Sequence, residues 1–180
     1  MLSIMIWFIG ALALAGLSWR AFAEPRSSRF VRLLGEATLW ALLVMNASGW
    51  LPDGISIPQI VSWIFLAVSL VLAFSGFYAL SGIGVSRGGR ARTGTPSQGV
   101  TLVTTGPYRH IRHPLHASLI LLSWGAAFAG LSFFGVCLAL TATGLFAFCS
   151  YLEEAENLER FGEKYDRYMD ATRMFIPGLF

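Results

Sequence analysis

Four long stretches of the chain contain no Asp, Glu, Lys or Arg, and short polar segments separate them. They cover residues 1–19, 37–52, 54–86 and 114–152. A membrane-spanning helix needs about 20 apolar residues to cross about 30 Å of hydrocarbon. As a single helix the last stretch would be roughly 58 Å long, so it must fold back on itself. The sequence GLSFFG, residues 130–135, is the expected turn.

This pattern predicts an all-α integral membrane protein with five transmembrane helices. The expected spans are residues 2–19, 36–52, 58–80, 114–129 and 132–152, of which the last two form a C-terminal helical hairpin. The sequence AFA at residues 21–23 is similar to a signal-peptidase site. A signal peptide, however, requires a basic residue before its apolar stretch, and this chain has none there. We therefore expect this stretch to remain as a span.

A cytosolic amphipathic helix is expected after the fifth span. Apolar side chains recur there at spacings of three and four, which is typical of one helix face. They are Leu158, Phe161, Tyr165, Tyr168 and Thr172. Gly162 interrupts this helix at a cost of about 1 kcal/mol relative to Ala, so we expect a neighbour to pack closely against it.

Composition and charge agree with a membrane protein. Of the 180 residues, 55% are hydrophobic and only 13% are charged, whereas about a quarter are charged in ordinary soluble domains. All 13 Lys and Arg residues fall in residues 20–35, 81–113 and 153–180. Because Lys and Arg collect in cytoplasmic loops, these segments are expected in the cytoplasm and the N-terminus outside. The basic balance thus indicates membrane orientation and not nucleic-acid binding.

All three histidines lie in the sequence PYRHIRHPLHAS, directly before the fourth predicted span. Pro114 suits the first turn of a helix, where its missing N–H is not needed. Arg112 and His113 would then lie at the positive, donor-rich end of that helix, which favours anions. The hairpin returns Glu153 and Glu154 to the same membrane face. Together these groups predict a cytoplasmic pocket for a zwitterionic small molecule.

Other interpretations of these segments stay open at this point. Arg109 and Arg112 are also suited to contact lipid phosphates. The three histidines are spaced for a metal site, but Pro114 interrupts the helical geometry and no further ligand set is present, so no metal is expected. Residues 81–106 are rich in Gly, Ser, Thr and Arg, which favours a flexible linker. An extended piece at residues 100–104 that lines a ligand is the alternative.

An ordered set of motifs resembles a known family. It consists of LVTTGPY at residues 102–108, RHP at 112–114, an uncharged hairpin, EE at 153–154, and then Leu158, Phe161, Gly162, Tyr165, Tyr168, Ile176 and Pro177. This order is similar to the isoprenylcysteine carboxyl methyltransferase and phospholipid methyltransferase family, over about residues 100–177.

The resemblance implies an integral membrane enzyme that binds S-adenosylmethionine in a cytosol-facing pocket and methylates a lipophilic small-molecule or lipid acceptor. It favours a cofactor-lining strand at residues 100–104. The implied cofactor contacts are Val100, Thr101, Leu102, Val103, Tyr108, His113, Pro114, Leu115, His116, Glu153 and Glu154. The candidate catalytic residues are Arg112, His113 and Arg109. Residues 100–180 would form the methyltransferase core, and residues 1–99 the N-terminal helices and basic loops.

Departures from the family pattern bear on the acceptor. The carboxyl methyltransferases carry an Arg four residues before the cofactor-binding Glu, where this chain has Cys149. A carboxylate acceptor is therefore disfavoured, and an amine, a thiol or another lipid nucleophile remains open. His116 and Ser118 replace a Tyr and a Gly that are common in the family, which leaves the shape of the pocket open.

Two alternative functions remain. One is an NADPH-dependent membrane reductase, because sterol reductases resemble this family in their C-terminal helices. The other is a non-enzymatic scaffold whose basic loops bind membrane lipids. The oligomeric state and the identity of the acceptor are left open.

Overall fold

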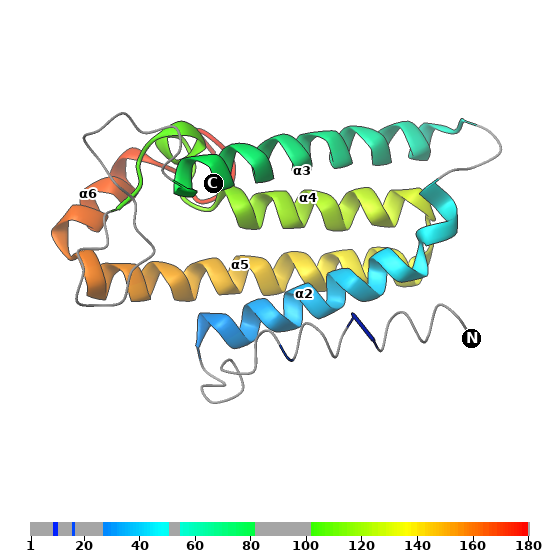
Figure 1. Cartoon of the computed structure of the whole chain (residues 1–180), viewed down its shortest axis with the longest axis horizontal. Helices are drawn as coiled ribbons and strands as arrows, with labels where there is room; N and C mark the ends of the chain where they lie inside the picture. Colours follow the sequence, from blue (N-terminus) through cyan, green and yellow to red (C-terminus); the bar gives the residue numbers. More distant parts are fainter. Residues whose placement is uncertain (1–8, 11–15, 17–26, 51–54, 82–101, 180) are drawn as a thin grey trace. The chain divides into compact units, whose positions relative to one another are not determined.

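The computed structural model describes residues 9–10, 16, 27–50, 55–81 and 102–179 (Figure 1). In chain order the longer elements are α2 (Ser28–Met45), η2 (Ala47–Trp50), α3 (Ile57–Ser81), η3 (Gly106–Arg109), α4 (Pro114–Ala129), α5 (Phe133–Phe161) and α6 (Glu163–Ala171). The η elements are short 3-10 helices. No strand occurs in the described ranges, so the predicted all-α class is confirmed there.

The C-terminal helical hairpin is confirmed. α4 has the bounds of the fourth predicted span, and α3 differs from the third by one residue at each end. α5 begins at Phe133, so the turn falls at residues 130–132. The parts of α4 and α5 next to this turn run antiparallel (Figure 1).

The second predicted span, residues 36–52, begins and ends too late, because α2 covers Ser28–Met45. α2 starts at Ser28 because its apolar face continues through Val31, which is buried like Leu39 and Leu42 further along the helix. Arg32 points away from this face and pairs with Glu36 one turn later at 3.5 Å. A search for uncharged stretches misses such a turn, because charges on the exposed side of a helix do not end it.

Two of the described helices, α3 and α5, are long and apolar enough to cross a membrane, and α4 is a shorter apolar helix. The first predicted span lies outside the described residues, apart from Ile9, Gly10 and Gly16. These helices agree with association with a membrane. The five-span arrangement stays a prediction.

The helix after the fifth predicted span is divided in two, which corrects the prediction of one separate amphipathic helix. α5 continues without a break to Phe161, and α6 follows Gly162. Gly162 has a positive φ of 55°, a conformation that only glycine adopts at little cost. A Cβ at this position would meet open space. The expected close packing at Gly162 is therefore wrong, and its role is to bend the chain between α5 and α6.

The chain divides into two compact units. The first comprises residues 1–69 and 119–153, and the second comprises residues 70–118 and 154–180. The predicted functional division between residues 99 and 100 stays a prediction.

Small side chains allow the helices of the first unit to pack closely. Its buried core consists of Leu42 from α2, Ala126 and Ala127 from α4, and Ala139 from α5. Helices in membranes associate through such small residues, because they bring two backbones together. A polar contact adds to this packing, since the buried Ser62 hydroxyl of α3 donates to a backbone carbonyl of α4 at 2.7 Å.

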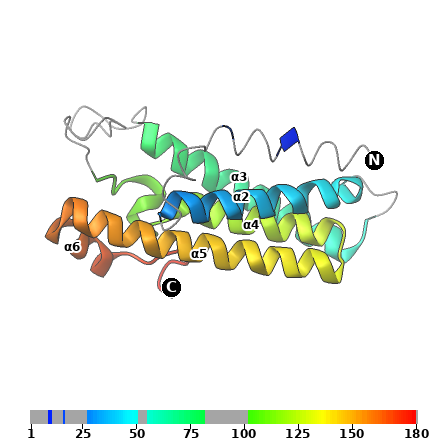
Figure 2. The same cartoon turned by 90° about the horizontal axis from the view of Figure 1, so that it is seen from below.

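α2 lies along α5 in the first unit (Figure 2), and Gly35 is the point of close approach. A Cβ at Gly35 would lie 2.8 Å from Cε1 of Phe146. Phe146 is fully buried, so its ring has no free space into which it can move.

We expect Gly35→Ala to lower the thermal stability of the protein in detergent. Overpacking costs about 1–3 kcal/mol, which outweighs the roughly 1 kcal/mol gained by replacing a helical glycine. Gly144→Ala in α5 is the matched control, because a Cβ there meets nothing within 4 Å. Its unfolding midpoint should stay unchanged or rise. An equal rise in both variants would contradict the close contact between Gly35 and Phe146.

Candidate functional site

The second unit contains most of the residues that the sequence analysis selected. Gly106 has a φ of 62° and opens η3, whose first turn contains Pro107. The backbone N–H groups of His110 and Ile111 both donate to the Pro107 carbonyl at 3.1 Å. Residues 112 and 113 then lead directly to Pro114, the first residue of α4. The Arg-His-Pro sequence therefore leads from η3 into α4, and the predicted start of that helix at Pro114 is confirmed.

The C-terminal residues pair with this junction through their backbones. Ile111 and Arg173 form an isolated parallel bridge. The N–H of Arg173 donates to the His110 carbonyl at 3.2 Å, and the N–H of Arg112 donates to the Arg173 carbonyl at 2.8 Å. The N–H of His113 donates to the Met174 carbonyl at 3.1 Å. These three hydrogen bonds fix the register between residues 110–113 and 173–174.

The Arg112 side chain connects three parts of the second unit. Its Nε lies 2.6 Å from Oε1 of Glu154, and the two side chains are only 10% and 8% exposed. Its Nη1 donates to the backbone carbonyls of Thr172 at 2.6 Å and Met169 at 3.2 Å. Both carbonyls lie at the C-terminal end of α6, where the helix dipole favours a cation. Arg112 therefore holds Glu154 and the end of α6 at the same time.

Tyr168 attaches α6 to η3. Its hydroxyl donates to the Tyr108 carbonyl at 2.6 Å. Burial, together with the neighbouring Tyr165, raises the pKa of Tyr168 far above its ordinary value. The hydroxyl consequently remains protonated, and able to donate, throughout the physiological pH range.

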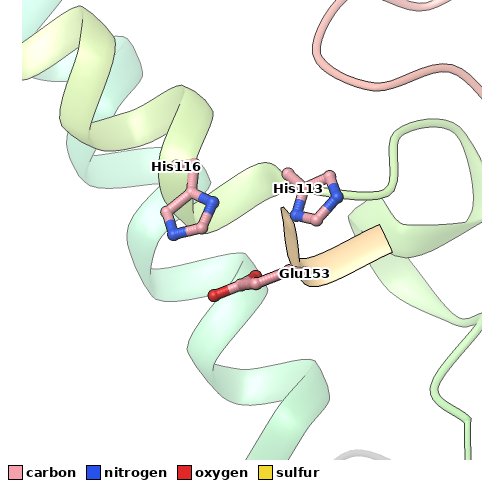
Figure 3. A group of neighbouring side chains, drawn as sticks. All are labelled: His113, His116 and Glu153. Carbon is pink, nitrogen blue, oxygen red and sulfur yellow. The ribbon is translucent and has the colours of Figure 1, made fainter. Parts of the chain in front are cut away.

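His113 lies between charged and aromatic neighbours at the start of α4. Its buried Nε2 is 3.4 Å from Oε1 of Glu154. The ring stacks on that of His116, with the centroids 5.6 Å apart and the planes 12° apart (Figure 3). The Phe175 ring approaches it with a centroid distance of 6.2 Å and a tilt of 51°. Burial raises the pKa of the Glu154 carboxyl, but hydrogen bonds from His113 and Arg112 outweigh this effect and hold the pKa below its usual value.

Comparison with known proteins identifies a family whose model includes the Arg-His-Pro sequence. A model of the phospholipid methyltransferase family matches residues 57–164, more than half of the chain. This chain belongs to the phospholipid methyltransferase family. The resemblance found in the sequence is thereby confirmed. The family match includes the residues from Tyr108 to His116 and both Glu153 and Glu154, and it ends within α6.

A stretch of 72 residues is also 32% identical to the methanethiol S-methyltransferase of Pseudomonas deceptionensis. This stretch covers 40% of the present chain and 27% of that relative. No solved structure matches the chain.

The structure brings together several of the residues implied by the family. Arg112, His113 and Glu154 are in mutual contact, and His116 stacks on His113. The backbone carbonyl of Tyr108 accepts a hydrogen bond from the Tyr168 hydroxyl of α6. Glu154 lies 42 residues from Arg112 and Tyr168 lies 60 residues from Tyr108, so these contacts are a property of the fold.

Other implied residues lie around this cluster. Pro114 is buried, and the half-buried Leu115 packs toward Gly76 of α3, where an added Cβ would lie 3.0 Å from Leu115 Cδ2. Arg109 is exposed. Glu153 is half-buried in α5 and belongs to the first unit, where the Cys149 thiol lies 3.9 Å from its Oε1.

The segment expected to form a strand does not do so where it is described. Leu102 and Val103 are half-buried but have no regular secondary structure, so the strand prediction is wrong for them. A strand needs a neighbouring strand for its backbone hydrogen bonds, and the described ranges contain none. Val100 and Thr101 lie outside the described residues.

The sequence analysis missed the C-terminal residues that complete the cluster. Met174 and Phe175 contact His113, and the carbonyl of Thr172 accepts from Arg112. Two of these three contacts use backbone atoms, which have no sequence signal.

We expect Glu154→Gln to destabilise the protein strongly. Removing one partner of a buried ion pair leaves the other charge uncompensated, at a cost of about 3–5 kcal/mol. Glu163→Gln is the matched control, since Glu163 is 94% exposed and lies 3.9 Å from Arg167; exposed pairs of this kind contribute little. Thermal unfolding in detergent measures both variants. Equal midpoints for the two would contradict the structural role of the Arg112–Glu154 pair.

Proposed function

We propose that this protein is a membrane-embedded methyltransferase that transfers a methyl group from S-adenosylmethionine to a lipophilic acceptor. The buried cluster of Arg112, His113 and Glu154 carries this proposal, because it lies within the stretch that matches the phospholipid methyltransferase family. The relative named as a methanethiol S-methyltransferase supports methyl transfer as the class of reaction.

The donor set fits this cofactor. S-adenosylmethionine carries a carboxylate, an ammonium group and a sulfonium, and the site offers both basic and acidic side chains. We assign the carboxylate to His113 and the beginning of α4, where helix amides favour anions. We assign the polar or cationic groups to Glu153 and the packing contact to Tyr108, as the family resemblance implies. Pro114, Leu115, His116 and residues 100–103 are the further cofactor contacts that the family resemblance implies.

When bound, the cofactor supplies an electrophilic methyl group for an in-line attack by the acceptor. The protein then has to position the nucleophile and exclude water. We assign the uptake of a proton from a thiol or an amine to Nδ1 of His113, because Nε2 faces Oε1 of Glu154 at 3.4 Å and this carboxylate stabilises the resulting imidazolium. Arg112 holds Glu154 in place for this step. Arg109, which is exposed, is assigned to an anionic group of the acceptor or of a neighbouring lipid.

The surroundings of Cys149 support a neutral or thiol acceptor over a carboxylate. Cys149 is fully buried, and its Sγ donates to the Ser28 carbonyl at 3.2 Å. The carboxyl methyltransferases carry a cation at this position, whereas here the side chain is uncharged. The related methanethiol methyltransferase acts on a thiol by its name. We therefore place lipophilic thiols first among the acceptors and amines second.

We further propose that the protein crosses the membrane five times, with its N-terminus outside and the cofactor site on the cytoplasmic side. The apolar helices α3 and α5 and the hairpin of α4 and α5 support this arrangement. The placement of all 13 Lys and Arg residues in three segments supports the orientation.

The first test is calorimetric titration of S-adenosylmethionine, and of its demethylated product, into the purified protein in detergent. We expect saturable binding in the micromolar range. His113→Ala should weaken it at least tenfold, about 1.4 kcal/mol, because this variant loses the proposed carboxylate contact. His110→Ala is the matched control, since the exposed His110 side chain lies three residues earlier. No binding to folded protein would contradict the proposal and favour the reductase or the scaffold.

The acceptor is tested with labelled S-adenosylmethionine and three acceptors that share one alkyl chain and end in a thiol, an amine or a carboxylate. We expect the thiol to be methylated fastest and the carboxylate slowest, because an anionic acceptor finds no cation at Cys149. Cys149→Ser serves as a control for any direct role of the sulfur and should keep this order. Preferential methylation of the carboxylate would contradict the assignment.

A further inference from the structure

The C-terminal strap, residues 172–175, lies against the Arg-His-Pro sequence although the family match ends at residue 164. We propose that this strap is a positioning element of the site, and that the Phe175 ring fixes the orientation of the His113 imidazole. The orientation of His113 follows from the geometry alone. Its effect on cofactor binding rests on the proposed function.

Backbone pairing determines where the strap lies. Hydrogen bonds of 2.8–3.2 Å join residues 110, 112 and 113 to residues 173 and 174. Because both segments contribute donors and acceptors, the strap cannot slide along the junction without breaking several bonds at once. The next residue, Phe175, is therefore held at a fixed position beside His113.

Arg112 fastens the strap at its other end. The guanidinium that binds Glu154 through Nε also donates from Nη1 to the carbonyls of Met169 and Thr172. Release of the strap would remove the Thr172 carbonyl from a nearly buried cation. The strap and the Arg112–Glu154 pair are consequently coupled.

The ring of His113 needs neighbours to hold its orientation. Rotation about the last side-chain bond of histidine is only weakly restricted by the residue itself. His116 stacks on the ring at a centroid distance of 5.6 Å, and Phe175 contacts it at 6.2 Å. These two contacts, together with Glu154 near Nε2, determine which way the ring nitrogens point.

The strap's contact with the site ends at Phe175. Phe175 is half-buried, whereas Ile176 and Leu179 beyond it are 52% and 77% exposed. Leu179 therefore provides a matched control in the same tail. A substitution there alters an apolar side chain without touching the described contacts of His113.

The experiment uses the full chain in detergent with isotope-labelled histidine, and compares Phe175→Leu, Phe175→Tyr and Leu179→Ala. Magnetic resonance of the imidazole signals reports the ring orientation, and calorimetry reports the affinity for S-adenosylmethionine. His110→Gln and His116→Gln assign the three histidine signals. Thermal unfolding confirms that each variant is folded.

We expect Phe175→Leu to shift the His113 signals, because the ring current of Phe175 is lost while apolar volume is kept. It should also weaken cofactor binding by roughly three- to tenfold, the range that an aromatic pair contributes. Phe175→Tyr should restore both properties, and Leu179→Ala should change neither. Rescue by Tyr separates a positioning role from a general loss of packing.

Two results would overturn the proposal. One is unchanged His113 signals in Phe175→Leu, and the other is an unchanged affinity despite shifted signals. If the unaltered protein binds no S-adenosylmethionine, the proposed function fails. The His113 signals then still decide whether the strap orients the ring.

Discussion

The buried pair of Arg112 and Glu154 is the interaction on which the second unit depends. Removing two charges from water costs several kcal/mol for each ion, and their attraction repays this only when further hydrogen bonds satisfy the remaining groups. Here those hydrogen bonds go to the carbonyls of Met169 and Thr172 at the end of α6. The need to satisfy one guanidinium thus brings together the start of α4, the end of α5 and the end of α6.

The same requirement explains why the candidate site lies where it does. Charged and titratable side chains are expensive within an apolar helix bundle, and the apolar parts of α4 and α5 contain none of the chain's Asp, Glu, Lys or Arg residues. The polar groups are concentrated at helix ends, where Pro114 begins one helix and Gly162 ends another.

Sequence patterns were sufficient where a single element decides the outcome. Pro114 correctly marked the start of α4, and the length of the last apolar stretch required the turn near Gly130. The order of motifs was sufficient to identify the family. The pattern was misleading where exposure on one helix face mattered, as at the charged first turns of α2. The pattern was also misleading at Gly162. This glycine is needed for its positive φ, which allows the bend, and not for its small size.

The sequence by itself determined the all-α class, the helical hairpin, the family and the identity of the polar residues, because these follow from local composition and the spacing of motifs. Only the tertiary structure decided that Arg112 binds Glu154 and that residues 173 and 174 pair with residues 110–113. It also decided that Phe175 lies beside His113. The physical reason is that these contacts join positions more than 40 residues apart, and several use backbone atoms that every residue carries. Their partners are therefore selected by packing and by the need to satisfy buried polar groups.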